Sequence, residues 1–198
     1  MDRLCSVPVV PVRSEPREDA ERVTELLRGE PVRVEDRRDG WARILTAYDY
    51  PGWVREEELD GRAPGDPITE ARRFLGAPYL WGGMTERGID CSVLVHMAYR
   101  RAGRLVPRDA DQQEEAATRV AEPDLRPGDL ITYAEEGKSH ATHIAFWLGD
   151  GRILHSSQRD GVNGVVEESE PRELNAIRRR LIRFFNETEL TAEREKRL

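Results

Sequence analysis

The feature that most constrains this chain is the change of sequence pattern at residues 61–67, Gly-Arg-Ala-Pro-Gly-Asp-Pro. Two prolines and two glycines in so short a segment are typical of a linker between folded units. At about 150 residues per domain, a chain of 198 residues has room for one to two domains. We therefore expect two domains, over residues 1–60 and 68–185, followed by a charged tail over 186–198.

The segment before the linker predicts a small β-barrel. Short apolar or alternating runs of strand character occupy residues 7–12, 30–35, 41–46 and 52–55. Turn signals between them recur about every ten residues, which is typical of small all-β domains. Pro8 and Pro11 predict that the first run is an edge strand, since proline cannot donate to a ladder. Within this segment, residues 20–28 have a helical pattern.

The segment after the linker predicts an α+β domain. Helices are expected over residues 68–75 and 91–101, and strands over 129–134, 142–148 and 152–157. The second helix is followed by Gly103, a residue suited to a helix C-terminus. The last two strands flank Gly149-Asp150-Gly151, a turn sequence typical of a β-hairpin.

Charge and composition argue against several classes of function. The formal net charge is −7 and the pI is about 5.3, which disfavours binding to nucleic acid or to anionic membranes. No apolar run approaches the roughly 18 to 20 residues that cross a bilayer, and the N-terminus lacks the pattern of a signal peptide. Cys5 and Cys91 form no disulfide framework. We expect a cytoplasmic protein with free thiols, and the sequence leaves its oligomeric state open.

Cys91 is the candidate nucleophile. It follows Asp90, a good N-cap residue, and opens the helix predicted over 91–101. The helix dipole at that position favours an anion, so we expect the pKa of the thiol to be lowered. The alternative is that Cys91 is a small buried hydrophobic residue, as most lone cysteines are.

A nucleophilic thiol needs a base and a group that orients the base. If Gly149-Asp150-Gly151 is a three-residue loop, His143 lies opposite Ser157 and His155 lies opposite Ala145. Both histidines then share one face as diagonal neighbours, whereas a two-residue loop would place them on opposite faces. We expect His143 to be the base and His155 to orient its ring. His96 faces elsewhere, because it is about 140° from Cys91 around the helix.

A zinc site is the competing interpretation. His140, His143 and His155 could supply three imidazoles. However, residues 140 and 143 of one strand point to opposite faces, unless His140 lies in the preceding loop. The chain also lacks the HExxH and CxxC motifs of common zinc sites. We therefore expect neither a metal nor another cofactor.

Five motifs resemble the NlpC-type cell-wall cysteine peptidases. They are Pro78-Tyr79-Leu80-Trp81-Gly82-Gly83, Asp90-Cys91-Ser92, Leu105-Val106-Pro107-Arg108-Asp109, Pro127-Gly128-Asp129-Leu130, and the segment from His143 to Ser157. They occur in the expected order across residues 68–182. The N-terminal segment resembles a bacterial SH3-like domain, marked by Trp41 and by Tyr50-Pro-Gly-Trp53. The combination is similar to the dipeptidyl peptidase VI type, a γ-D-glutamyl-L-diamino acid endopeptidase.

The resemblance implies a papain-like α+β domain with Cys91, His143 and His155 as its catalytic set. The implied reaction is cleavage of the bond between γ-D-Glu and the diamino acid in murein peptides with a free N-terminal L-Ala, during cell-wall peptide recycling. The implied partner is therefore a murein-derived peptide. Two alternatives remain: an amidase or acyltransferase that acts on another amide, and a non-catalytic murein-peptide-binding protein.

The resemblance also assigns residues around the nucleophile. Tyr79 is placed beside the reaction centre, and Asp90 and Ser92 are placed at the free amine of the substrate. Arg108 and Asp109 are expected to line the cleft, although Arg108 could instead form an internal ion pair and Asp90 could only cap its helix. Tyr50 is expected to close the end of the pocket, joined by one of the barrel glutamates Glu15, Glu18 or Glu21.

Four further residues have a structural interpretation or depart from the family pattern. Trp41, Trp53 and Trp81 are expected to belong to the core rather than to contact a ligand. Val93 stands where the family has glycine after Asp-Cys-Ser, and its bulk puts the level of activity in doubt.

Overall fold

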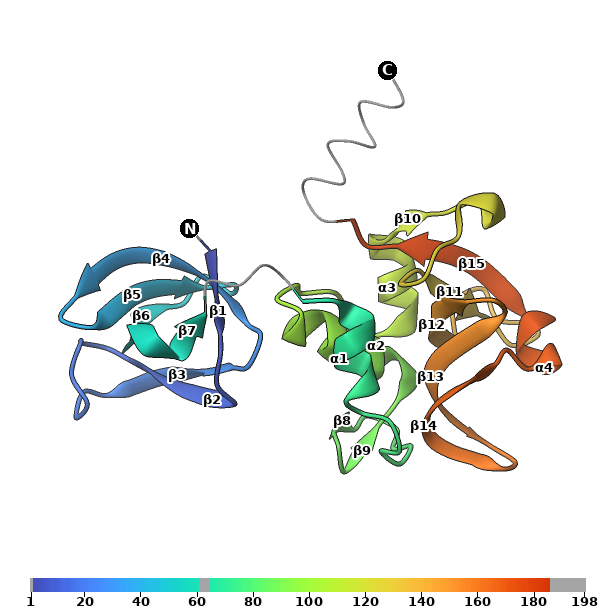
Figure 1. The fold of residues 1–198 in the computed structure, drawn as a ribbon, viewed down its shortest axis with the longest axis horizontal. Coiled ribbons are helices and arrows are strands. Elements are labelled where there is room, and N and C mark those ends of the chain that lie inside the picture. Colours follow the sequence, from blue (N-terminus) through green and yellow to red (C-terminus); the bar gives the residue numbers. More distant parts are fainter. Residues whose placement is uncertain (1, 61–64, 186–198) are drawn as a thin grey trace, which may run out of the picture. The chain divides into compact units, whose positions relative to one another are not determined.

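The computed structural model of the chain describes residues 2–60 and 65–185 and contains two compact units (Figure 1). One unit comprises residues 1–70 and 99–105, and the other comprises residues 71–98 and 106–198. Residues 61–64 of the expected linker and the expected tail over 186–198 lie outside the described residues. Pro67, at the end of the expected linker, is already helical. The domain boundaries therefore stay a prediction.

The first unit contains a seven-stranded antiparallel sheet with the strand order β3-β2-β6-β5-β4-β1-β7. Its elements are β1 (Asp2–Cys5), β2 (Val9–Arg13), β3 (Arg22–Leu27), β4 (Pro31–Arg38), β5 (Trp41–Thr46), β6 (Pro51–Arg55), the 3-10 helix η1 (Glu56–Glu58) and β7 (Leu59–Asp60). Its core is a cluster of small and branched apolar side chains that includes Val10, Val12, Leu26, Ile44 and Val54. The expected all-β architecture is observed. Among the described residues, β3 and β7 are the two ends of the sheet and do not pair with each other.

Two expectations for this unit are wrong. Residues 20–28 contain the strand β3 rather than a helix, because this segment pairs along β2 and buries Leu26 in the core. The prolines do not place β2 at an edge either. That strand pairs with β3 along its length and with β6 at Arg13, beyond both prolines.

The second unit is built on a six-stranded antiparallel sheet with the order β10-β15-β11-β12-β13-β14. The strands are β10 (Thr118–Arg119), β11 (Leu130–Tyr133), β12 (His143–Gly149), β13 (Arg152–Arg159), β14 (Val162–Ser169) and β15 (Arg178–Arg183), with a separate ribbon of β8 (Met84–Thr85) and β9 (Gly88–Ile89). The chain beyond β7 also contains the helices α1 (Pro67–Arg72), α2 (Cys91–Arg101), α3 (Ala110–Ala116), α4 (Arg172–Asn175) and the 3-10 helix η2 (Glu122–Asp124); α1 and α2 each cross a division between the two units. The α+β class is confirmed, whereas β14 and β15 are strands that the sequence analysis missed.

Side-chain contacts fix the layers of this unit. Thr132 of the sheet donates to Glu114 of α3 over 2.5 Å, and α3 lies on the same side of the sheet as α2 (Figure 1). On the other face, Ile131 and Ile153 pack with Leu174 of α4. None of the helices within the described ranges is both long enough and apolar enough to span a membrane.

Helix α2 begins and ends where local chemistry predicts. Its first residue is Cys91, and Oδ1 of Asp90 accepts the backbone N–H of Val93 over 2.9 Å, as an N-cap does. At the other end Gly103 adopts a left-handed backbone with φ +81°, which ends the helix at little steric cost. Val93 is completely buried in the first turn, so the helix accommodates the bulk that departs from the family pattern.

Candidate active site

The thiol of Cys91 is buried at the N-terminus of α2. Burial raises the pKa of Cys91 to about 11, and the charge of Asp90 adds to this rise. Backbone N–H groups of Ile144, Ser92 and Cys91 itself face the sulfur and oppose the shift only in part. The expected lowered pKa is therefore wrong: loss of solvent outweighs the helix terminus. A neutral thiol in this position needs a base to become a nucleophile.

The two histidines of the hairpin meet, although the loop is not the expected one. Gly149 pairs with Arg152, so only Asp150 and Gly151 connect the strands, and the three-residue loop is wrong. A register shift between Trp147 and Gly149 then pairs Trp147 with Ile153 and Phe146 with Leu154, the register expected from the longer loop. Nε2 of His143 consequently lies 2.8 Å from Nδ1 of His155. The rings meet edge to face, with their centroids 5.1 Å apart. The prediction that both histidines share one face is confirmed.

The start of β12, where His143 lies, passes the thiol of Cys91. Ile144, the next residue, directs its backbone N–H at the sulfur of Cys91. Burial lowers the pKa of His143 to about 3, and the charge of His155 contributes. At neutral pH the ring is therefore uncharged and can accept a proton. Because Nε2 is bonded to His155, Nδ1 is the nitrogen left for the thiol.

The hydrogen-bonded chain continues past His155 to a residue that the sequence analysis missed. Nε2 of the completely buried His155 lies 2.7 Å from Oε1 of Glu168 on β14. The second carboxylate oxygen of Glu168 accepts a hydrogen bond from Arg159. The signal that could have found this strand is Asp160-Gly161, a second hairpin turn sequence, between β13 and β14.

A cleft of about 390 Å³ opens at His143. It is lined by Tyr79, Trp81, Glu135, Thr142, His143, Ser157, Gln158, Arg159, Glu173, Leu174 and Ile177. Burial raises the pKa of Tyr79, and nearby Cys91 and Asp90 raise it further, so this phenol stays protonated beside the thiol. Trp81 is 76% exposed, so the expectation that it belongs to the core is wrong. It is a wall of the cleft, available to a ligand.

Asp90 is occupied by four donors of the protein. Its carboxylate accepts hydrogen bonds from the backbone N–H groups of Gly82 and Val93, from Ser92 Oγ and from Arg108. With 1% of its surface exposed, it is a buried anchor, and contact with a substrate amine would require displacing one of these donors. Asp90 caps α2 and pairs with Arg108 in this structure, and a contact of either residue with substrate stays a prediction.

Ser92 and Asp109 surround the same anchor. The hydroxyl of Ser92 donates to Asp90 over 3.1 Å, and its backbone oxygen accepts from Gln113 over 2.9 Å, so both polar groups are engaged inside the protein. Asp109 is an exposed carboxylate that pairs with Arg108. Tyr79, rather than these residues, is the predicted neighbour of Cys91 that lines the cleft.

Comparison with known proteins agrees with this geometry. The model of the NlpC/P60 family matches residues 76–181, more than half of the chain. The chain belongs to the NlpC/P60 family. A second family model, the bacterial dipeptidyl-peptidase Sh3 domain, matches residues 12–59. NlpC/P60 proteins with a Cys-His constellation of this kind are cysteine peptidases.

Two relatives and one solved structure show how far the similarity extends. The γ-D-glutamyl-L-lysine dipeptidyl-peptidase of Bacillus cereus is 32% identical over 65% of this chain and 42% of that protein. The protein of the same name from Bacillus subtilis is 37% identical over 58% of this chain and 40% of that protein. The chain thus spans about two fifths of the length of these relatives. A crystal structure of an NlpC/P60 family protein from Bacillus cereus matches 93% of this chain and 63% of that chain, with 25% identity and a TM-score of 0.60.

Other residues expected at the site belong to the SH3-like part of this NlpC/P60 protein. Tyr50 is half-exposed and lines a separate pocket of about 150 Å³ that also includes Glu30. Of the barrel glutamates, Glu18 pairs with Arg55 over 2.7 Å and Glu15 pairs with Arg17 over 3.2 Å. A contact of Tyr50 or these glutamates with the cleft stays a prediction. Trp41 and Trp53 are buried, as expected.

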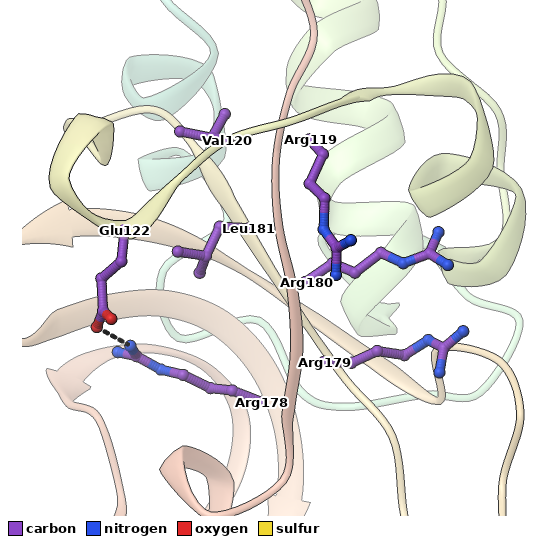
Figure 2. Close-up of a pocket in the computed structure, with 7 residues that line it drawn as sticks. All are labelled: Arg119, Val120, Glu122, Arg178, Arg179, Arg180 and Leu181. Atoms are coloured by element: carbon purple, nitrogen blue, oxygen red, sulfur yellow. Dashed lines mark ion pairs between the residues drawn. The ribbon is translucent and has the colours of Figure 1, made fainter.

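A second hollow of the NlpC/P60 unit has a different character. Figure 2 shows this pocket, with Val120, Leu181 and Glu122 on one side and Arg119 and Arg180 on the other. Its volume is about 250 Å³, and Arg178 and Arg179 also line it. Arg178 pairs with Glu170 and Glu122, and Arg179 pairs with Glu114 over 2.8 Å. Neither a thiol nor an imidazole lines it. The imidazole of His143, by contrast, lines the cleft of about 390 Å³.

The geometry also bears on the zinc alternative. His143 and His155 direct nitrogens at each other over 2.8 Å, while His140 is exposed and precedes β12. Within residues 2–60 and 65–185, the structure contains no group of three or more His, Cys, Asp or Glu side chains arranged to hold a metal ion.

Proposed function

We propose that this protein is a cysteine endopeptidase that hydrolyses the γ-D-glutamyl–L-diamino acid bond of murein peptides with a free N-terminal L-Ala, in the recycling of cell-wall peptides. The observation that carries the proposal is the hydrogen-bonded pair His143 and His155: His143 lines the cleft, and its chain neighbour Ile144 directs a backbone N–H at the thiol of Cys91. The names of the two dipeptidyl-peptidase relatives support the bond and the substrate class. The cytoplasmic location expected from the sequence is part of the same proposal.

The reaction begins with proton transfer inside the protein. Nδ1 of His143 takes the thiol proton of Cys91 while the sulfur attacks the γ-carbonyl carbon of the glutamyl residue. The developing oxyanion lies near the backbone N–H groups at the start of α2 and the phenol of Tyr79, which the raised pKa keeps as a donor. His155 stabilises the imidazolium that forms on His143.

Collapse of the tetrahedral intermediate breaks the amide C–N bond, and the imidazolium of His143 gives its proton to the departing amine. The glutamyl group is left as a thioester on Cys91. Water, deprotonated by His143, then attacks the thioester carbon, the C–S bond breaks, and the thiol regains its proton. All proton transfers use groups already at the site.

The cleft has charges that suit a γ-linked glutamyl peptide. Such a substrate has a free α-carboxylate near the scissile bond, and Arg159 supplies a cation at the cleft wall. The carboxylates of Glu135 and Glu173 lie in the same lining and suit the ammonium groups of a diamino acid. Trp81 offers an exposed apolar surface to the peptide.

The test is cleavage of a defined peptide, followed by mass spectrometry. L-Ala-γ-D-Glu-L-Lys and its meso-diaminopimelate counterpart are incubated with the wild-type protein, beside N-acetylated copies and the Cys91→Ala variant. We expect release of L-Ala-D-Glu from the free peptides only, and none with Cys91→Ala. Cleavage of the acetylated copies as well would remove the requirement for a free amine. No cleavage of any peptide would overturn the proposed substrate and direct the search to other amides.

A further inference from the structure

Glu168 ends a hydrogen-bonded series that starts at His143, the proposed base. His155 is wholly buried between two partners, with Nδ1 facing His143 at 2.8 Å and Nε2 facing Glu168 at 2.7 Å. The carboxylate is 22% exposed and also accepts from Arg159, a residue of the cleft lining. Burial raises the pKa of Glu168, but hydrogen bonds from Arg159 and His155 outweigh it and hold the pKa below its ordinary value.

The charge state of Glu168 determines the position of each proton in the series. An ionised carboxylate can only accept, so Nε2 of His155 must carry a proton. Burial lowers the pKa of His155, which is therefore neutral, and its Nδ1 must be an acceptor. Nε2 of His143 is then the donor in the bond between the rings, and Nδ1 of neutral His143 has a free lone pair. That lone pair is what removal of the Cys91 proton requires.

We propose that Glu168 is a positioning residue that sets the tautomers of both imidazoles and so keeps Nδ1 of His143 available as the base. The inference rests on the proposed function, since it concerns the base of that reaction. Glu168 acts through His155 and does not touch the thiol. The spacing of residues 143 and 155 does not determine the tautomers, because either of two neutral imidazoles can donate the hydrogen bond between them.

Arg159 makes the proposal sharply testable. A guanidinium has five donors and no acceptor, so in Glu168→Gln the amide oxygen must face Arg159. The amide NH₂ then faces Nε2 of His155 and donates to it. Nδ1 of His155 becomes the donor to His143, and the proton of neutral His143 moves to Nδ1. The base is thereby lost while the volume and packing of the side chain are retained.

The primary measurement is the ¹⁵N NMR spectrum of histidine-labelled protein, which distinguishes protonated from unprotonated ring nitrogens. Signals are assigned with single His→Gln variants. In the wild type, we expect Nε2 protonated and Nδ1 unprotonated in both His143 and His155. In Glu168→Gln, we expect the reverse in both rings, with a loss in kcat on the order of 10²- to 10⁴-fold, the range for a base held in the wrong tautomer.

Two further variants separate positioning from structure. Glu167→Gln is the matched control, since Glu167 is the preceding residue of β14, on the opposite face, and pairs with Arg72 and Arg152 rather than with a histidine. It should leave both tautomers as in the wild type. In the double variant Glu168→Gln with Arg159→Met, the introduced amide can turn its oxygen toward His155, and the wild-type tautomers should return in part.

Each result decides the inference. A wild-type spectrum with the proton of His143 on Nδ1 would overturn it, even if no variant folds. So would unchanged tautomers in folded Glu168→Gln. The rate at which iodoacetamide alkylates Cys91 at neutral pH reports how readily His143 removes the thiol proton, and it needs no peptide substrate. We expect this rate to be lower in Glu168→Gln than in Glu167→Gln. If the tautomers agree but no murein peptide is cleaved, the proposed substrate fails and the role of Glu168 stands.

Discussion

Replacing Asp90 by alanine tests whether this carboxylate is a buried anchor or a substrate contact. In the folded protein it accepts from the backbone N–H groups of Gly82 and Val93, each at 2.9 Å, from Ser92 at 3.1 Å and from Arg108 at 2.9 Å. These bonds join the start of α2, the loop before it and the segment that follows the helix. Asp90→Ala leaves all four donors without their acceptor.

The cost can be worked out donor by donor. Loss of an N-cap side chain costs about 0.5–2 kcal/mol of unfolding free energy. The N–H of Gly82, left without a partner inside the protein, costs about 1–3 kcal/mol. A third of the Arg108 side chain is exposed, so its ion pair contributes only about 0–1 kcal/mol after solvent screening. Together we expect Asp90→Ala to lower the free energy of unfolding by about 1.5–6 kcal/mol.

Urea unfolding followed by circular dichroism measures this loss of stability. Peptide cleavage at urea concentrations where both proteins remain folded measures whether Asp90 also contacts the substrate. Asp109→Asn is the control, because Asp109 is 45% exposed and pairs with the same Arg108, so it should cost less than about 1 kcal/mol. The reasoning is refuted if Asp90→Ala is as stable as Asp109→Asn. It is also refuted if the only effect is a higher KM for the free peptide.

Three further predictions follow from burial and backbone geometry. The pKa of His143 falls from 6.5 to about 3 on folding, so between these pH values the unfolded chain binds a proton that the folded chain does not. The free energy of unfolding should therefore decline as the pH is lowered from 6.5 to about 3. Urea titrations at a series of pH values should show this decline, and His143→Gln should reduce it. Val93→Gly removes a fully buried side chain and adds glycine to a helix, so it should cost about 2–4 kcal/mol by urea unfolding, and higher kcat at equal stability would contradict this. A Cβ at Gly164, where φ is +150°, would overlap the carbonyl of Ala77, so Gly164→Ala should lower the thermal midpoint more than Gly161→Ala, which has open space; equal midpoints would contradict it.

Local chemistry explains what could be predicted about the site. Asp90 and Gly103 mark the ends of α2 because capping and a left-handed backbone depend on residues within one turn. Gly149-Asp150-Gly151 marks the turn of the hairpin, but the register that brings His143 and His155 to one face also depends on the shift between Trp147 and Gly149, which the sequence analysis did not predict. The expected helix over 20–28 failed for the complementary reason: pairing with β2, the preceding strand of the sheet, outweighs local preference.

The sequence alone established the chemical groups and their local placement, which are a cysteine at a helix start and two histidines across a hairpin. Their protonation depends on the tertiary structure. Desolvation of Cys91 outweighs the helix terminus, and Glu168, on a strand paired beyond the hairpin, directs the protons of both rings. Spacing can position a side chain, but solvent access and hydrogen-bond partners depend on segments far away in the chain, and these set where protons reside.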